Sequence, residues 1–130
     1  MKKMILADEL AQIAEHWRPR VVGALNGQEV KLAKFCGTFP WHHHDDADEL
    51  FLGVSGSFRV EFRDRVVTLG PGEFLVVPRG VEHRTVADQE AAVLLFEPAG
   101  VHNTGNVVDP VYTAPGGRSP SPLGGEGDRG

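Results

Sequence analysis

Four of the six histidines in this chain lie in two short segments that also carry acidic residues. The first segment, residues 39–49, reads Phe-Pro-Trp-His-His-His-Asp-Asp-Ala-Asp-Glu, and the second, residues 78–83, reads Pro-Arg-Gly-Val-Glu-His. Imidazole nitrogens mixed with carboxylate oxygens suit a divalent first-row transition metal, whereas calcium and magnesium prefer shells made of oxygen alone. These residue types therefore indicate a transition-metal site on a β scaffold.

The spacing selects four candidate ligands. On a strand, His42 and His44 would point to one face and His43 to the other, so His43 is predicted not to be a ligand. The four residues before Glu49 leave room for a tight turn that brings its carboxylate back over the same face. His83 follows a Pro-x-Gly turn at the end of an apolar strand and completes the set.

The run of three histidines could instead be a tag remnant or a solvated turn. A tag would be terminal, whereas this run is framed by Phe39, Pro40 and Trp41. A His-x-His pair alone is a weak motif. Its combination with Glu49 and His83 makes metal binding the preferred interpretation.

The two segments resemble the paired signature motifs of the cupin superfamily, Gly-x5-His-x-His-x3or4-Glu-x6-Gly and Gly-x5-Pro-x-Gly-x2-His-x3-Asn. The first motif is matched, in order, by His42, His44, Glu49 and Gly56, and the second by Gly72, Pro78, Gly80 and His83. Two positions depart from the pattern. Gly37 stands four rather than five residues before His42, and Ala87 occupies the place of the motif's Asn.

The resemblance covers about residues 35–98 and implies an all-β fold, the cupin double-stranded β-helix or jelly-roll barrel. It also implies one metal ion held in the barrel mouth by His42, His44, Glu49 and His83. The ligand set accommodates zinc, manganese, iron, nickel or cobalt and does not select among them. Similar family members isomerise sugars, open sugar acids or split C–C bonds with O2, and others have no known reaction.

The remainder of the chain divides into three parts. Apolar residues at helical spacing over residues 5–17 predict one short amphipathic helix in an N-terminal helical segment, residues 1–20. The barrel is predicted over residues 21–112, since 130 residues suit one domain. Gly, Pro and Ser dominate residues 113–130, which predicts a disordered tail.

Within the barrel, Asn26-Gly27 predicts the first hairpin. Residues 74–77 are almost continuously apolar and are predicted to be buried on both faces. Residues 84–86 and 91–96 are predicted to form a last hairpin around a polar turn, and residues 100–108 a loop with an edge strand.

Residues 50–54 and 93–96 are apolar at both odd and even positions. Both faces of these strands are therefore expected to be buried, including the face that points away from the barrel. A homodimer packed through an outer sheet face is the favoured explanation. The alternative is that residues 5–17 or the packing of the two sheets supply the cover.

The composition limits the kinds of binding partner that we expect for this chain. A net charge of −5 predicts neither nucleic-acid nor membrane binding and leaves a small molecule as the expected ligand. Cys36 is the only cysteine, which excludes an intrachain disulfide. With no signal-peptide core at the N-terminus, a cytoplasmic location is the default expectation.

Four further residues are candidates for contact with a substrate. Arg79 and Arg84 flank His83 and could hold an anion, Phe51 could wall the cavity, and Cys36 could share the ligand face if no bulge intervenes. For each of them a plain surface or core role stays open. No general acid and base pair is evident on the inner face besides the ligands.

The first functional hypothesis is a metal-dependent enzyme of isomerase or dioxygenase type that acts on a small oxygenated metabolite, such as a sugar, sugar acid, hydroxy acid or diketone. The alternative is a cupin that binds a metal or a small ligand without turnover. A third possibility is a structural homodimer with a vestigial site, against which the intact ligand set argues.

Overall fold

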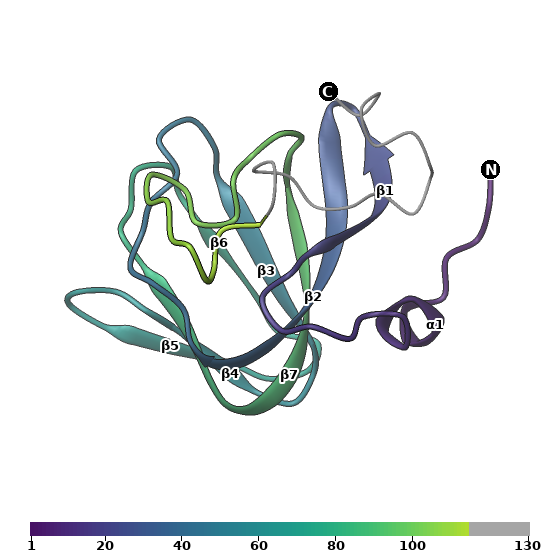
Figure 1. The fold of residues 1–130 in the computed structure, drawn as a ribbon, viewed down its shortest axis with the longest axis horizontal. Coiled ribbons are helices and arrows are strands. Elements are labelled where there is room, and N and C mark those ends of the chain that lie inside the picture. Colours follow the sequence, from purple (N-terminus) through teal and green to yellow (C-terminus); the bar gives the residue numbers. More distant parts are fainter. Residues whose placement is uncertain (115–130) are drawn as a thin grey trace.

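The computed structural model describes residues 1–114, which form one short helix and seven strands (Figure 1). These elements are, in chain order, α1 (Leu6–Leu10), β1 (Arg20–Leu25), β2 (Gln28–Thr38), β3 (Glu49–Ser55), β4 (Phe58–Glu61), β5 (Val66–Leu69), β6 (Phe74–Val77) and β7 (Arg84–Pro98). The all-β prediction with a small N-terminal helix is confirmed. No helix among the described residues is long and apolar enough to cross a membrane.

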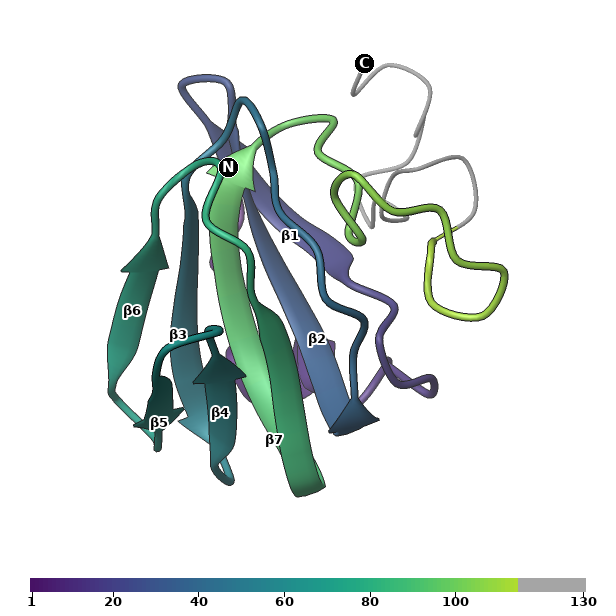
Figure 2. The same ribbon diagram turned by 90° about the vertical axis from the view of Figure 1, so that its left-hand side faces the viewer.

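The strands pair antiparallel in the order β1-β2-β7-β3-β6, while β4 pairs with both β5 and β7. Figure 2 shows β4 and β5 standing in front of the main sheet, with β7 shared between the two layers. The predicted hairpin at Asn26-Gly27 joins β1 to β2, and both turn residues have positive φ. This arrangement is a jelly-roll barrel whose core lies between the layers.

β7 is one strand of 15 residues where a hairpin was predicted. Its N-terminal part pairs with the end of β2 and with β4, and its C-terminal part pairs with β2 and β3. The polar residues 88–90 were interpreted as a turn, but they are an exposed stretch of the strand opposite a register shift in β2 between Phe35 and Gly37. Residues 88–90 are polar because they are exposed at a bulge in the strand, and the chain does not reverse its direction there.

The core is rich in aromatic rings. The indole of Trp17 stacks on Phe35 at a centroid distance of 4.5 Å and lies 4.8 Å from Phe39. Phe51 and Phe58 contact Phe35 from the facing strands. These rings pack directly below the histidine-containing loops.

The helix is shorter than the predicted residues 5–17, because Ile13 and Trp17 do not lie on one helix face. Ile13 packs with Val22 and Leu32 on the outer face of the sheet, whereas Trp17 enters the inner core. Trp17 has a φ of 62°, which redirects the chain between the two faces. Ile13 and Trp17 are four residues apart, but they pack into two separate apolar clusters and do not form one turn of a helix.

The outer sheet face is covered only in part. Leu6 and Leu10 of α1 pack against the cluster that includes Leu32 and Leu94, as the alternative to a dimer required. β6 lies at the edge of the sheet, and Phe74 and Val76 are 64% and 47% exposed. The prediction that this strand is buried on both faces is therefore wrong.

Residues 99–114, the closing segment, contain turns and no strand, so the predicted edge strand does not form. The amide of Asn103 donates to the carbonyl oxygens of Tyr112 and Trp17, and the guanidinium of Arg18 donates to the carbonyl of Tyr112. Thr113 hydrogen bonds within this segment and Ala114 is buried. The rest of the predicted tail, residues 115–130, lies outside the described residues.

Candidate metal centre

The four predicted ligands come from three places in the fold. His42 and His44 lie in the loop between β2 and β3, Glu49 is the first residue of β3, and His83 immediately precedes β7. The backbones of His42 and His83 form an isolated β-bridge with two hydrogen bonds of 2.9 Å. The loop is not a strand, yet His42 and His44 point inward while His43 faces out, where its Nδ1 lies 2.8 Å from Asp45 Oδ1.

The ligand atoms of His42, His44, Glu49 and His83 all lie within 4.8 Å of one another. Glu49 Oε1 is 3.3 Å from His44 Nε2 and 3.5 Å from His83 Nε2. All four residues are buried. The cluster could hold a metal ion.

Two imidazoles are held in the tautomer that a metal requires. The Nδ1 atoms of His42 and His83 each lie 2.9 Å from a backbone carbonyl, of Pro40 and Val81 respectively. A carbonyl oxygen only accepts, so these Nδ1 atoms carry the proton and their Nε2 atoms keep a free lone pair. Such carbonyl contacts also fix the orientation of a ligating imidazole.

Three atoms of this cluster that point inward lack well-placed hydrogen-bond partners. His44 Nε2, His83 Nε2 and Glu49 Oε1 are buried, and none has a hydrogen bond of good geometry. Buried polar atoms without partners are costly. A cation between them would satisfy all three, so the residues present fit a divalent metal.

The protonation states also favour metal binding. Burial, together with the proximity of His83, lowers the pKa of His42 to about 4. Burial alone would raise the pKa of Glu49, but the imidazoles of His44 and His83 hold it well below the ordinary value. A neutral His42 and an ionised Glu49 are the forms that coordinate a metal.

A second carboxyl group, that of Glu97, lies beside the cluster and was missed by sequence reasoning. Glu97 is the penultimate residue of β7 and is 3% exposed. Its Oε1 accepts a hydrogen bond of 2.9 Å from the ammonium of Lys31, which is also buried. Burial and the charge of Glu49 raise the pKa of Glu97 well above the ordinary value, against the effect of Lys31. The inward parity of Glu97 with Leu95 was the signal available in the sequence.

Three buried carboxyl groups and one buried ammonium lie at this end of the barrel. The Lys31 ammonium lies 3.9 Å from Glu29 and 2.9 Å from Glu97, and Glu97 interacts in turn with Glu49. The ionised Glu49 carboxylate is the charge that a cation between the four candidate ligands would neutralise.

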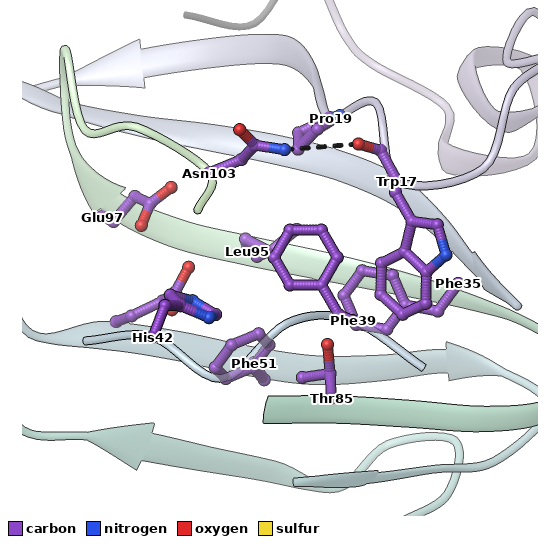
Figure 3. A pocket seen from close by; sticks show the side chains of 11 residues that line it. Trp17, Pro19, Phe35, Phe39, His42, Phe51, Thr85, Leu95, Glu97 and Asn103 are labelled. Atoms are coloured by element: carbon purple, nitrogen blue, oxygen red, sulfur yellow. Dashed lines mark hydrogen bonds between the residues drawn. The ribbon is translucent and has the colours of Figure 1, made fainter. Parts of the chain in front are cut away.

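A narrow cavity runs from the ligands into the aromatic core (Figure 3). Its walls include His42 and Glu97 at one end and Trp17 and Phe35 at the other. Glu49 also lines the cavity. Phe51, predicted to wall the cavity, also lines it. The free volume is about 30 Å³, which holds about two water molecules.

The structure does not bring the other three predicted contact residues into this cavity. Arg79 is exposed and pairs with Asp48 at 3.2 Å. Arg84 pairs with Glu61 at 2.7 Å. Cys36 lies half-buried at the β2 register shift, where its carbonyl accepts a hydrogen bond from the Trp17 indole. Their roles toward a substrate stay predictions.

Comparison with known proteins gives one family. The family model described as "Cupin domain" matches residues 27–107. The curated protein YdbB of Bacillus subtilis (strain 168), described as uncharacterized, is 38% identical over 65 residues. That match covers 49% of this chain and 58% of YdbB, so the chain spans less than two thirds of this relative's length.

Two crystal structures resemble about three quarters of this chain. A cupin-2 domain containing protein from Shewanella frigidimarina NCIMB 400 is 39% identical with a TM-score of 0.72, covering 73% of this chain and 93% of that one. Protein NMB1881 from Neisseria meningitidis is 31% identical with a TM-score of 0.69, covering 75% of this chain and 100% of that one.

Proposed function

The chain belongs to the cupin domain family, and on this premise we propose that it binds one divalent transition metal through His42, His44, Glu49 and His83. We propose further that the bound ion serves an isomerase or dioxygenase type of reaction on a small oxygen-bearing molecule. The observation that carries the proposal is the set of buried, unsatisfied Nε2 and Oε1 atoms directed at one another.

Such an ion, when bound, supplies Lewis acidity toward the oxygen atoms of a substrate. The protein's own residues orient the ligands and exclude water. The carbonyl groups of Pro40 and Val81 keep two imidazoles aimed inward. The aromatic rings around the cavity keep bulk water away, which strengthens every electrostatic interaction inside it.

A second candidate function is metal binding without turnover. It is favoured by the small free volume of the cavity, about 30 Å³, which accommodates an ion and its water ligands but not a sugar acid without movement of the walls.

A turnover screen separates the two candidates. The metal-loaded protein is assayed with sugar acids and β-diketones, in air and under nitrogen, beside a Glu49→Ala variant treated in the same way. A rate that depends on Glu49 supports the enzyme, and its loss under nitrogen identifies oxygen chemistry. Equal rates in both proteins would leave metal binding without turnover.

A further inference from the structure

The wall of the cavity is largely apolar. Away from the metal ligands its main contacts are the aromatic rings of Trp17, Phe35, Phe39 and Phe51, together with Leu95. Among the described residues, no lysine or arginine lines it, and Arg79 and Arg84 are paired with carboxylates elsewhere. An anion entering this cavity would lose its hydration without gaining a side-chain counter-charge from that wall.

The charge at the ligand end disfavours an anion further. Glu49 and Glu97 both line the cavity there. Neither side chain carries a positive charge, and the Lys31 ammonium beside Glu97 does not line the cavity. The lining of the cavity therefore favours an uncharged molecule over an anion.

Glu97 offers one hydrogen-bonding position toward the cavity. Lys31 holds its Oε1 at 2.9 Å and the carboxyl group also interacts with that of Glu49, while its buried Oε2 lacks a hydrogen bond of good geometry. Figure 3 shows this carboxyl group at the same end of the cavity as His42, with the rings of Trp17 and Phe35 at the other end. A hydroxyl group placed near the metal ligands would satisfy Oε2.

We propose that this site takes an uncharged molecule with a hydroxyl group on a flat, apolar body, and that Glu97 hydrogen bonds that hydroxyl. The flat body would contact the aromatic rings, where stacked and edge-to-face contacts add to the burial of apolar area. This inference rests on the proposed function, since it names the class of molecule for the same site.

Entry of such a molecule requires part of the wall to move, because the free volume is about 30 Å³. The wall beside Trp17 is formed by the closing segment. Asn103 lines the cavity and bonds the backbone of Trp17 at 3.4 Å, a long hydrogen bond, and Tyr112 packs edge-on against the Trp17 ring. These contacts are the ones that a ligand would displace.

The test compares three probes of similar shape, phenol, anisole and benzoate, by NMR titration of the full chain with and without metal. Phenol has the hydroxyl donor, anisole lacks it, and benzoate is an anion. We expect phenol to bind about tenfold more tightly than either of the others, the factor that one hydrogen bond worth about 1.4 kcal/mol supplies.

The double variant Lys31→Met/Glu97→Met removes the closest buried ion pair together, so Glu97 is not simply left without its cation, and it also removes the 3.9 Å contact of Lys31 with Glu29. It should bind phenol and anisole equally. Glu29→Gln is the matched control, a change of a buried carboxyl group that does not line the cavity, and it should keep the preference for phenol. Should the double variant fail to fold, Glu97→Asp, which withdraws the carboxyl group by one methylene, should reduce the preference.

Benzoate binding as tightly as phenol would overturn the proposal, as would a preference for phenol that survives in the Glu97 variants. Metal content is measured on the same samples. A protein that binds no metal but shows the Glu97-dependent preference would contradict the proposed function alone, and one that binds metal without the preference would contradict this inference alone.

Discussion

His83 Nε2 lies 3.5 Å from Glu49 Oε1, although the two residues precede or begin different strands. The contact joins the two histidine-containing segments into one site. It is held by the β-bridge between His42 and His83, which anchors both loops to each other through the backbone. The site is thus preformed by main-chain hydrogen bonds and does not depend on long flexible side chains.

The pH dependence of stability follows from His42. Its pKa is about 4 in the folded chain and 6.5 in the unfolded chain, so between these values the unfolded state binds more protons. The contribution of His42 is complete above pH 6.5 and is lost as the pH falls toward 4. Urea titrations of metal-free protein should show the free energy of unfolding falling by roughly 3 kcal/mol from this residue. In His42→Gln this part of the pH slope should be absent, and an unchanged slope would contradict the assignment.

Trp17 should be the more important tryptophan for stability. The residue is 7% exposed, and its ring stacks on Phe35 and donates from Nε1 to the Cys36 carbonyl at 2.9 Å. Trp17→Ala should cost about 3–5 kcal/mol of unfolding free energy. Trp41→Ala is the control, since Trp41 is half-buried under the guanidinium of Arg63, and it should cost clearly less. Similar losses in thermal melts of the two variants would count against this packing.

Gly105 allows the closing segment to approach the histidine loop. It has a φ of 56°, and a Cβ there would lie 2.1 Å from the His43 carbonyl oxygen. Gly105→Ala should destabilise the protein by about 1–3 kcal/mol or detach the segment, which limited proteolysis would detect. Gly100→Ala shares the positive φ but meets nothing within 4 Å, so its smaller effect measures backbone strain alone. Equal effects of the two changes would mean that the close approach is absent.

The homodimer stays a prediction. We expect its interface at the exposed edge strand β6. Phe74 and Val76 stand beside Leu52 and Leu50 of β3 on the outer face. Light scattering at micromolar concentration should give twice the chain mass, and Phe74→Glu should give the monomer mass. Val108→Glu, at another exposed apolar position, should leave the dimer intact. A monomeric mass for the unchanged protein would rule the dimer out.

The cluster of four candidate ligands was predictable because motif spacing and inward alternation act over short stretches of chain. His42, His44, Glu49 and His83 converge as predicted, and the hairpin at Asn26-Gly27 forms as predicted. Glu97 was not identified, because its partner Lys31 lies in another strand and a charged residue after an apolar run is normally a strand end.

Features that depend on the whole fold were not predictable from local patterns. Nothing in the spacing of Ile13 and Trp17 shows that they reach opposite faces of the sheet. The polar residues 88–90 looked like a turn because their exposure at a bulge depends on the register with β2. Phe74 looked buried because an apolar strand at a sheet edge has the same composition as one in a core.

Metal binding by the four converging residues can be measured by elemental analysis of tag-free protein by plasma mass spectrometry, beside His83→Ala and the control His43→Ala. His83 is one of the four residues, and His43 is its outward-facing counterpart. We expect about one divalent transition metal per chain in the unchanged protein and in His43→Ala, and loss of that metal in His83→Ala. No bound metal after reconstitution, or equal metal in the two variants, would contradict a metal centre at this site.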